Sequence, residues 1–183
     1  MFKIFGTLSR VEELPPPLLG FYSKTFLCYN IIMEKFGKIY LATDHAGFEL
    51  KEKIKKHLEN CGKEFEDFGA FVLNEGDDYP DFVSLCAKAV AGDEGSFGIV
   101  FGGSGTGEAI CANKTVGVRV CVYYGGDLEI VRLAREHNNA NVLSLGARFL
   151  EEKEAILAID NFLNTSFSND ERHIRRINKI ENN

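Results

Sequence analysis

From residue 38 onward, the apolar positions of the chain switch between the period of a strand and the period of a helix. Residues 38–43 form a short apolar run, and Phe97–Phe101 form a continuous one, which is typical of a strand buried on both faces. In residues 48–60 the apolar positions recur at helical spacing instead, and Gly62 follows as a residue that commonly ends a helix. The same reasoning predicts strands at 38–43, 64–68, 97–101, 117–123 and 141–146, and helices at 48–60, 81–91, 107–114, 127–136 and 151–163.

This alternation predicts an α/β domain with a mostly parallel sheet that helices cover on both faces. Its crossovers are expected to be right-handed. Ligands of such sheets bind beyond the carboxyl ends of the strands, so we expect the site in the loops after residues 43, 101, 123 and 146. In the second helix, which Pro80 can open, we expect Phe82, Leu85 and Ala89 to face the core.

Residues 1–36 show no sustained period of apolar positions and contain three consecutive prolines, Pro15 to Pro17. We expect residues 1–36 to be an N-terminal extension, either loosely ordered or the product of a start codon placed upstream of Met33. A docked N-terminal arm is the alternative. Residues 37–183 are expected to form one domain that ends in a C-terminal helix.

Charge and cysteine content narrow the function classes. The net charge is −6 and there is no basic block, so neither nucleic acid nor an anionic membrane is an expected partner. No apolar run is long enough to cross a membrane, and Glu12 and Glu13 fall where a signal peptide would be apolar. The sequence has five cysteines, an odd number, and no CxxC motif. This pattern predicts reduced thiols, a cytoplasmic location and no metal site.

A glycine-rich segment follows the predicted strand 97–101 and leads into a helix. Its backbone N–H groups can cradle an anion. It lacks both nucleotide fingerprints, because Glu108 stands at the third glycine position of the dinucleotide pattern and no Gly-Lys-Ser/Thr follows. Glu108 itself is either a partner of the helix dipole or a general base whose pKa is adjusted by burial. The cradle, named the glycine loop below, consists of Gly103, Ser104, Gly105, Thr106 and Gly107.

Further polar residues gather at other predicted loops. Asp44 and His45 follow the first strand, where they either cap the next helix or face the crevice. His137 and Asn138 fall between a helix and a strand, and both are also ordinary turn residues. Arg172 and Arg176 would share one helix face, which suits a phosphate monoester, although a solvated basic face is the alternative. Arg148 follows the last predicted strand.

Taken together and in this order, these segments resemble the ribose-5-phosphate isomerase B family, within the wider group that includes galactose-6-phosphate isomerase subunits. The resemblance covers about residues 37–180. It implies a three-layer α/β/α sandwich with a mostly parallel, five-stranded Rossmann-like sheet. It also implies a homodimer or homotetramer with active sites at the subunit interface, and a reaction without metal or other cofactor. The segments that carry it are Thr43 to Gly47, Gly103 to Glu108, Ala112 to Lys114, Glu136 to Leu143, Gly146 to Arg148, and Arg172-His173 with Arg176.

The resemblance assigns roles to individual residues. One branch of the family has Cys at the position of Gly102, and the other has Gly there with Glu at the position of Glu108, so Glu108 is the implied base. His137 is the implied ring-opening acid, and Asp44 and Asn138 would orient sugar hydroxyls. The implied phosphate ligands, some of them from a second subunit, are Arg148, Arg172, Arg176 and His45.

Two positions depart from the family pattern, and the substrate stays open. Asn139 stands where Asp is common, and Glu171 where Gly is common. We expect neither to abolish catalysis, although Glu171 could weaken phosphate binding. The expected function is aldose–ketose isomerisation of ribose 5-phosphate and ribulose 5-phosphate. The alternatives are an isomerase of a 6-phosphohexose such as allose or galactose 6-phosphate, and a non-catalytic sugar-phosphate sensor. The presence of Glu108 and His137 argues against the sensor.

Overall fold

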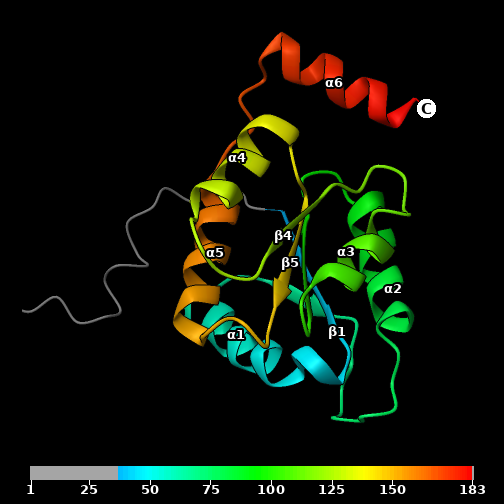
Figure 1. The fold of residues 1–183 in the computed structure, drawn as a ribbon, viewed down its shortest axis with the longest axis vertical. Coiled ribbons are helices and arrows are strands. Elements are labelled where there is room, and N and C mark those ends of the chain that lie inside the picture. Colours follow the sequence, from blue (N-terminus) through cyan, green and yellow to red (C-terminus); the bar gives the residue numbers. More distant parts are fainter. Residues whose placement is uncertain (1–36, 183) are drawn as a thin grey trace, which may run out of the picture. The chain divides into compact units, whose positions relative to one another are not determined.

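The computed structural model describes residues 37–182, and the expectation for residues 1–36 lies outside them (Figure 1). Within this part, five parallel strands form one sheet in the order β2-β1-β3-β5-β4. The parallel sheet predicted from the sequence is therefore confirmed. The strands are β1 (Ile39–Thr43), β2 (Phe65–Asp67), β3 (Phe97–Gly102), β4 (Val120–Tyr123) and β5 (Val142–Gly146).

Helices cover both faces of the sheet. The chain forms a short 3-10 helix η1 (His45–Gly47), α1 (Phe48–Asn60), α2 (Tyr79–Gly92), α3 (Thr106–Ala112), α4 (Glu129–Asn138), α5 (Glu152–Asn164) and α6 (Glu171–Glu181). Helices α1, α4 and α5 pack on one face, and α2 and α3 on the other (Figure 1). The three-layer α/β/α sandwich is thus confirmed.

The central strands form the core of this sandwich. Every residue of β1, β3 and β5 is buried, which explains why these segments read as continuous apolar runs. On one face, Ile54 and Leu58 of α1 pack into the same apolar cluster as Phe162 of α5. Each such side chain contributes about 1.5–3 kcal/mol by leaving water, so this packing holds α1 and α5 against the sheet.

Two local predictions are wrong in detail. Of the three α2 residues predicted to face the core, Phe82 and Ala89 are partly buried against its apolar cluster, but Leu85 is 47% exposed. The fully covered positions of the helix are Val83, Cys86, Ala87 and Val90. Leu85 lies four residues after Asp81 and three before Lys88, so the helical period places it on the polar face that these two exposed residues mark. Strand β4 begins three residues later than predicted, because Gly117 adopts a left-handed turn with φ of 83°.

A buried lysine anchors the carboxyl end of β2. Lys51 of α1 is fully buried, and its Nζ lies 2.6 and 2.8 Å from the carboxylate oxygens of Asp67 and 2.7 Å from the carbonyl oxygen of Ala70. Burial lowers the pKa of Lys51, against the raising effect of Asp67. The same segment is tied to β1 by two backbone hydrogen bonds of 2.7 Å between Thr43 and residues 69 and 70. The loop that leads to α2 is therefore held against the end of β1.

None of the helices between residues 37 and 182 is both long and apolar enough to span a bilayer.

Candidate active site

The carboxyl ends of β1, β3 and β5 carry most of the side chains that the sequence singled out. β1 leads directly into Asp44 and η1, β3 leads into the glycine loop, and β5 leads into Ala147 and Arg148. These three strands are neighbours in the sheet. The structure therefore places these segments at one edge, as expected for a parallel α/β sheet.

Hydrogen bonds from β5 and from the two residues that follow it hold the glycine loop in place. Ser144 Oγ donates a 2.6 Å hydrogen bond to the carbonyl oxygen of Gly105, and the backbone N–H groups of Ala147 and Arg148 donate to the carbonyl oxygens of Gly102 and Gly103. Gly105 adopts a left-handed conformation, with φ of 76°, at the N-cap of α3. Its lack of a side chain allows this turn, and the loop is thereby fixed at the start of α3.

Glu108 lies in the first turn of α3 and is only 4% exposed. Its carboxyl group occupies the space directly over Gly102, because a Cβ added to that glycine would overlap the Glu108 carboxyl carbon and both oxygens. A side chain at position 102 and the present position of the Glu108 carboxyl group therefore exclude each other. This gives a physical reason for finding Gly at 102 together with Glu at 108.

The surroundings of Glu108 make its carboxylate a stronger base than an exposed glutamate. Burial raises the pKa of Glu108, and the nearby charge of Asp44 raises it further, while the Glu108 backbone N–H acts in the opposite direction. A residue that only complements a helix dipole has no need to be buried. The burial of Glu108 thus favours the general-base interpretation.

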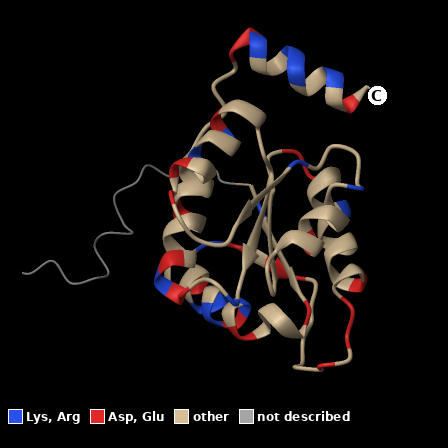
Figure 2. Cartoon of the chain, in the orientation of Figure 1, with Lys and Arg blue, Asp and Glu red and all other residues tan. Residues whose placement is uncertain are grey.

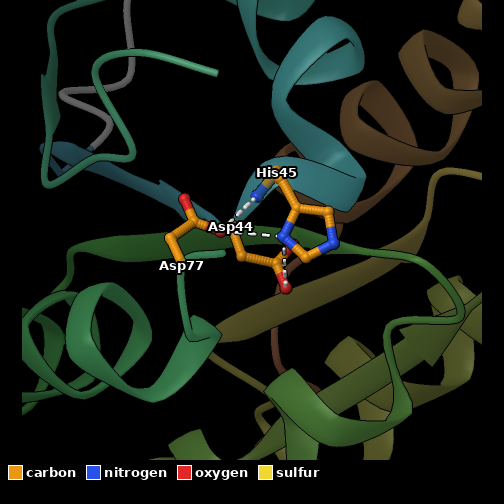
Figure 3. Close-up of side chains that lie close together, drawn as sticks. All are labelled: Asp44, His45 and Asp77. Atoms are coloured by element: carbon orange, nitrogen blue, oxygen red, sulfur yellow. Dashed lines mark hydrogen bonds and ion pairs between the residues drawn. The ribbon is translucent and has the colours of Figure 1, made fainter. Parts of the chain in front are cut away.

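Asp44 and His45 lie close to a third residue, Asp77 (Figure 3). Asp44 is buried, and its Oδ1 accepts a 2.9 Å hydrogen bond from the backbone N–H of Ala46. Nδ1 of His45 lies 2.8 Å from Asp77 Oδ1. The sequence gives no signal for Asp77, because it lies in the loop before α2, away from the strand ends and from every motif.

Arg148 is the last of the predicted residues at this edge of the sheet. Its side chain lies beside the glycine loop, since a Cβ added to Gly103 would be 3.3 Å from the guanidinium carbon of Arg148. One chain thus brings together one set of predicted site residues, which we call the carboxyl-end cluster: Asp44, His45, the glycine loop, Glu108 and Arg148.

The remaining predicted residues lie at the other end of the sheet and form the amino-end cluster: His137, Asn138, Arg172 and Arg176. His137 and Asn138 form the last turn of α4 rather than a turn after it, and the chain then enters the amino end of β5. The two arginines lie on α6, which Figure 1 shows beyond the end of the sheet opposite η1. At about 3.3 Å per residue, β5 alone separates the two clusters by about 15 Å.

Helix α6 is packed against the end of α4 by a pair of histidines. The His137 and His173 rings lie 4.4 Å apart, and His173 Nδ1 lies 2.9 Å from Ser168 Oγ. His173 is buried, and burial lowers its pKa. In contrast, Arg172 and Arg176 are exposed on the positively charged α6 (Figure 2).

The two departures from the family pattern are accommodated by the local structure. Asn139 adopts a left-handed conformation with φ of 46° after α4, which asparagine tolerates well, and its side chain accepts a 3.0 Å hydrogen bond from Arg135. Glu171 is exposed in the first turn of α6, a favourable place for a carboxylate.

Three cysteines of the described part lack the features of a nucleophile. Burial raises the pKa of Cys86, Cys111 and Cys121, the last to about 11, so their thiolate forms are disfavoured. For Cys111 the charge of Glu108 adds to this effect. The cytoplasmic location expected from the cysteine pattern stays a prediction.

Known proteins resemble this chain in sequence and in fold. Residues 39–180 match the family model described as Ribose/Galactose Isomerase. The chain is 46% identical over 140 residues to ribose-5-phosphate isomerase B of Mycobacterium leprae, which covers 76% of this chain and 85% of the relative.

Solved structures show the same fold. The ribose 5-phosphate isomerase of Thermotoga maritima superposes with a TM-score of 0.75 at 41% identity, covering 80% of this chain and 99% of that one. Ribose-5-phosphate isomerase B of Mycoplasma genitalium, solved with bound ribulose-5-phosphate, gives 0.75 at 38% identity, with 79% and 94% covered. By sequence and by structure, this chain belongs to the ribose/galactose isomerase family.

Proposed function

We propose that this chain is an aldose–ketose isomerase that interconverts D-ribose 5-phosphate and D-ribulose 5-phosphate. The observation that carries the proposal is the buried carboxyl group of Glu108 over Gly102, at the start of α3 and next to the glycine loop. The relative solved with bound ribulose-5-phosphate supports the choice of substrate. A base beside an anion cradle is what proton transfer next to a carbonyl group requires.

In the proposed reaction, the Glu108 carboxylate removes the proton from C2 of the open-chain aldose. The electrons of that C–H bond form the C1–C2 double bond of a cis-enediolate, while the C1 carbonyl electrons move onto O1. The hydroxyl proton on O2 then passes to O1, the C2 carbonyl forms, and Glu108 returns the first proton to C1 to give the ketose. Backbone N–H groups of the glycine loop stabilise the oxygen that becomes negative, a contact worth about 3–4 kcal/mol for a well-placed donor. Asp44 orients sugar hydroxyl groups beside the base.

The amino-end cluster enters the reaction from a second copy of the chain. A single chain keeps His137, Asn138 and the α6 arginines a strand length away from Glu108, and these side chains are at least partly exposed. In a two-fold dimer, the amino-end cluster of each copy meets the carboxyl-end cluster of the other, so one contact creates two sites. A homotetramer is a pair of such dimers.

Exposed apolar side chains support a dimer contact of this kind. Tyr124 and Phe149 are 56% and 64% exposed near the carboxyl ends of the strands, with ring centroids 6.2 Å apart. On α6, Ile174 and Ile180 are 40% and 63% exposed. Covering these surfaces would remove apolar area from water at the two places where the clusters have to meet.

Within the joined site, the phosphate lies among cationic side chains from both copies. Arg148 and His45 come from the copy that supplies Glu108, and Arg172 and Arg176 from the partner. Guanidinium groups bind phosphate oxygens through charge-assisted hydrogen bonds. His137 of the partner acts as the acid that opens the sugar ring, and Asn138 beside it orients the hydroxyl groups.

A coupled isomerase assay on the full chain tests the proposal, with ribose 5-phosphate, allose 6-phosphate and galactose 6-phosphate as substrates. We expect the highest kcat/KM for ribose 5-phosphate. A preparation of Glu108→Gln made in the same way controls for contaminating isomerases. Higher kcat/KM for a hexose phosphate would contradict the choice of substrate, and no turnover of any of the three would contradict the proposed activity.

A further inference from the structure

The loop before α2 contributes the carboxylate of Asp77, which is not part of any motif in the sequence. Asp77 lies two residues before α2, and the loop that carries it begins where Gly69 and Ala70 are hydrogen-bonded to Thr43 at the end of β1. This attachment brings Asp77 next to His45, although 32 positions separate them in the sequence.

One oxygen of Asp77 contacts His45 twice. Asp77 Oδ1 accepts a 2.9 Å hydrogen bond from the backbone N–H of His45 and lies 2.8 Å from the ring nitrogen Nδ1 (Figure 3). The Asp44 carboxylate is 4.0 Å from the same nitrogen. Because Nδ1 is directed to Asp77, the nitrogen on the other side of the ring, Nε2, is the one that can face a ligand.

The second oxygen of Asp77 indicates that its negative charge has a role besides accepting the hydrogen bonds that hold the loop. Oδ2 is buried and has no hydrogen-bond partner among the described residues, which is unfavourable for a charged atom. Asparagine could accept both hydrogen bonds through its own Oδ1 without burying a charge. What aspartate adds at this position is a negative charge next to the His45 ring.

That charge changes the protonation of His45. The hydrogen bond to Asp77 raises the pKa of His45, and the charge of Asp44 raises it further, while desolvation acts in the opposite direction. A doubly protonated ring donates from both nitrogens, whereas a neutral ring that donates from Nδ1 offers only an acceptor at Nε2. The other charged groups lining the hollow beside His45 are Glu49 and Lys53 of α1 and Glu151 and Glu152 at the start of α5.

We propose that Asp77 is a positioning residue, which orients the His45 ring and supplies the countercharge that lets Nε2–H donate to the phosphate of the substrate. This inference rests on the proposed function, because it takes the ligand of His45 to be a sugar phosphate. Asp77 does not touch the substrate itself. It acts through His45, as outer carboxylates act on many functional histidines.

Histidine-ring NMR on the full chain tests this inference without turnover. The His45 resonances are identified by their loss in His45→Gln, and titrated in the wild type, Asp77→Asn, Asp77→Glu and Asp78→Asn. We expect Asp77→Asn to lower the pKa of His45 by about one unit or more and Asp77→Glu to retain most of the elevation. Asp78→Asn removes the same charge from an exposed neighbour and should leave His45 nearly unchanged.

Binding of inorganic phosphate and kinetics give the functional readout. At pH 7, Asp77→Asn should weaken phosphate binding about tenfold and raise KM for ribose 5-phosphate similarly, with kcat within about twofold of the wild type. An unchanged His45 titration in Asp77→Asn, or equal losses in Asp77→Asn and Asp77→Glu, would overturn the inference.

The wild type alone still decides the matter if Asp77→Asn does not fold. Nitrogen-15 shifts should show both ring nitrogens of His45 protonated at a pH above the ordinary histidine pKa of about 6.5, and a singly protonated ring there would overturn the inference. Failure of the proposed function is distinguishable, because it appears as a wild type that does not isomerise ribose 5-phosphate, whatever the state of His45.

Discussion

The two clusters differ in how completely the fold builds them. In the carboxyl-end cluster, Glu108 and Asp44 are buried, and hydrogen bonds from the β5 segment hold the glycine loop. In the amino-end cluster, Arg172 and Arg176 are exposed on α6. The carboxylate that would act as the base is preorganised inside one chain, whereas the arginines on α6 that would bind phosphate face solvent.

This difference indicates which role each cluster has in the proposed dimer. A base has to be placed and desolvated to work, and a folded core does this at no further entropic expense when substrate arrives. Arginines that serve a neighbouring copy have to stay exposed until that copy is present. The comparison therefore predicts an effect on kcat from Glu108 in the first cluster and effects on KM from the α6 arginines in the second.

The largest effect is expected from Glu108→Gln. It keeps the size of the side chain and removes the base, so kcat should fall by about 10²–10⁴-fold while sugar-phosphate affinity stays close to that of the wild type. Steady-state kinetics and a binding titration measure the two quantities. Turnover that survives this substitution would reject Glu108 as the base.

A smaller but still large loss is expected from Gly102→Ala. The new methyl group would displace the Glu108 carboxyl group, and misplacement of a catalytic group by about 1 Å costs about 100-fold in rate. Gly92→Ala is the matched control, because a Cβ at the end of α2 meets open space. Thermal melting checks that both variants fold. Activity near the wild-type level in folded Gly102→Ala would mean that the position of Glu108 does not matter.

Arg172→Ala should weaken substrate binding by the amino-end cluster. Loss of one charge-assisted contact of about 1.5–3 kcal/mol should raise KM for ribose 5-phosphate about 10- to 100-fold, with little change in kcat. Lys88→Ala removes the same charge from the exposed surface of α2 and should leave KM unchanged. A fall in kcat alone would show that Arg172 does not contribute to ground-state phosphate binding.

The smallest expected effect is a displacement of the pH profile. A general base has to be ionised in the free enzyme, so kcat/KM should rise with pH as Glu108 loses its proton. Because burial raises the pKa of Glu108, this acid limb should lie above the ordinary glutamate value of about 4.3. The profile is measured with substrate well below KM. A limb centred at or below the ordinary value would contradict a desolvated base.

Much of the fold could be predicted from the sequence, because the strands are buried on both faces. Ile39–Thr43 and Phe97–Gly102 are fully buried, so they appear as apolar runs that no helix period explains. In α2 the prediction was right for Phe82 and wrong for Leu85, because apolar character was given more weight than the polar face that Lys88 marks. The burial of Lys51 depends on Asp67 and Ala70, which only the folded chain brings to it.

The candidate site was predictable only in part. Strand ends and glycines identified the segments around Asp44, Glu108 and Arg148, because a parallel sheet fixes where those segments meet. The place of His137 at the opposite end of the sheet from Glu108 follows from the order of the elements, since His137 precedes a parallel strand and Glu108 follows one, but no local motif points to it. Asp77 escaped detection because its importance comes from a contact across 32 positions rather than from a motif.

Mixing two defective chains tests the central claim, that the carboxyl-end cluster of one copy works with the amino-end cluster of another. One chain carries Glu108→Gln, and the other carries His137→Asn and Arg172→Ala. Each is assayed alone at low substrate, and then both are refolded together in equal amounts.

If sites are shared in a two-fold dimer, random pairing leaves each hybrid with one fully intact site, and the mixture should recover about a quarter of the wild-type activity. If each chain builds its site from its own residues, no intact site can form. Activity of the mixture that stays at the average of the two separate variants would contradict the account.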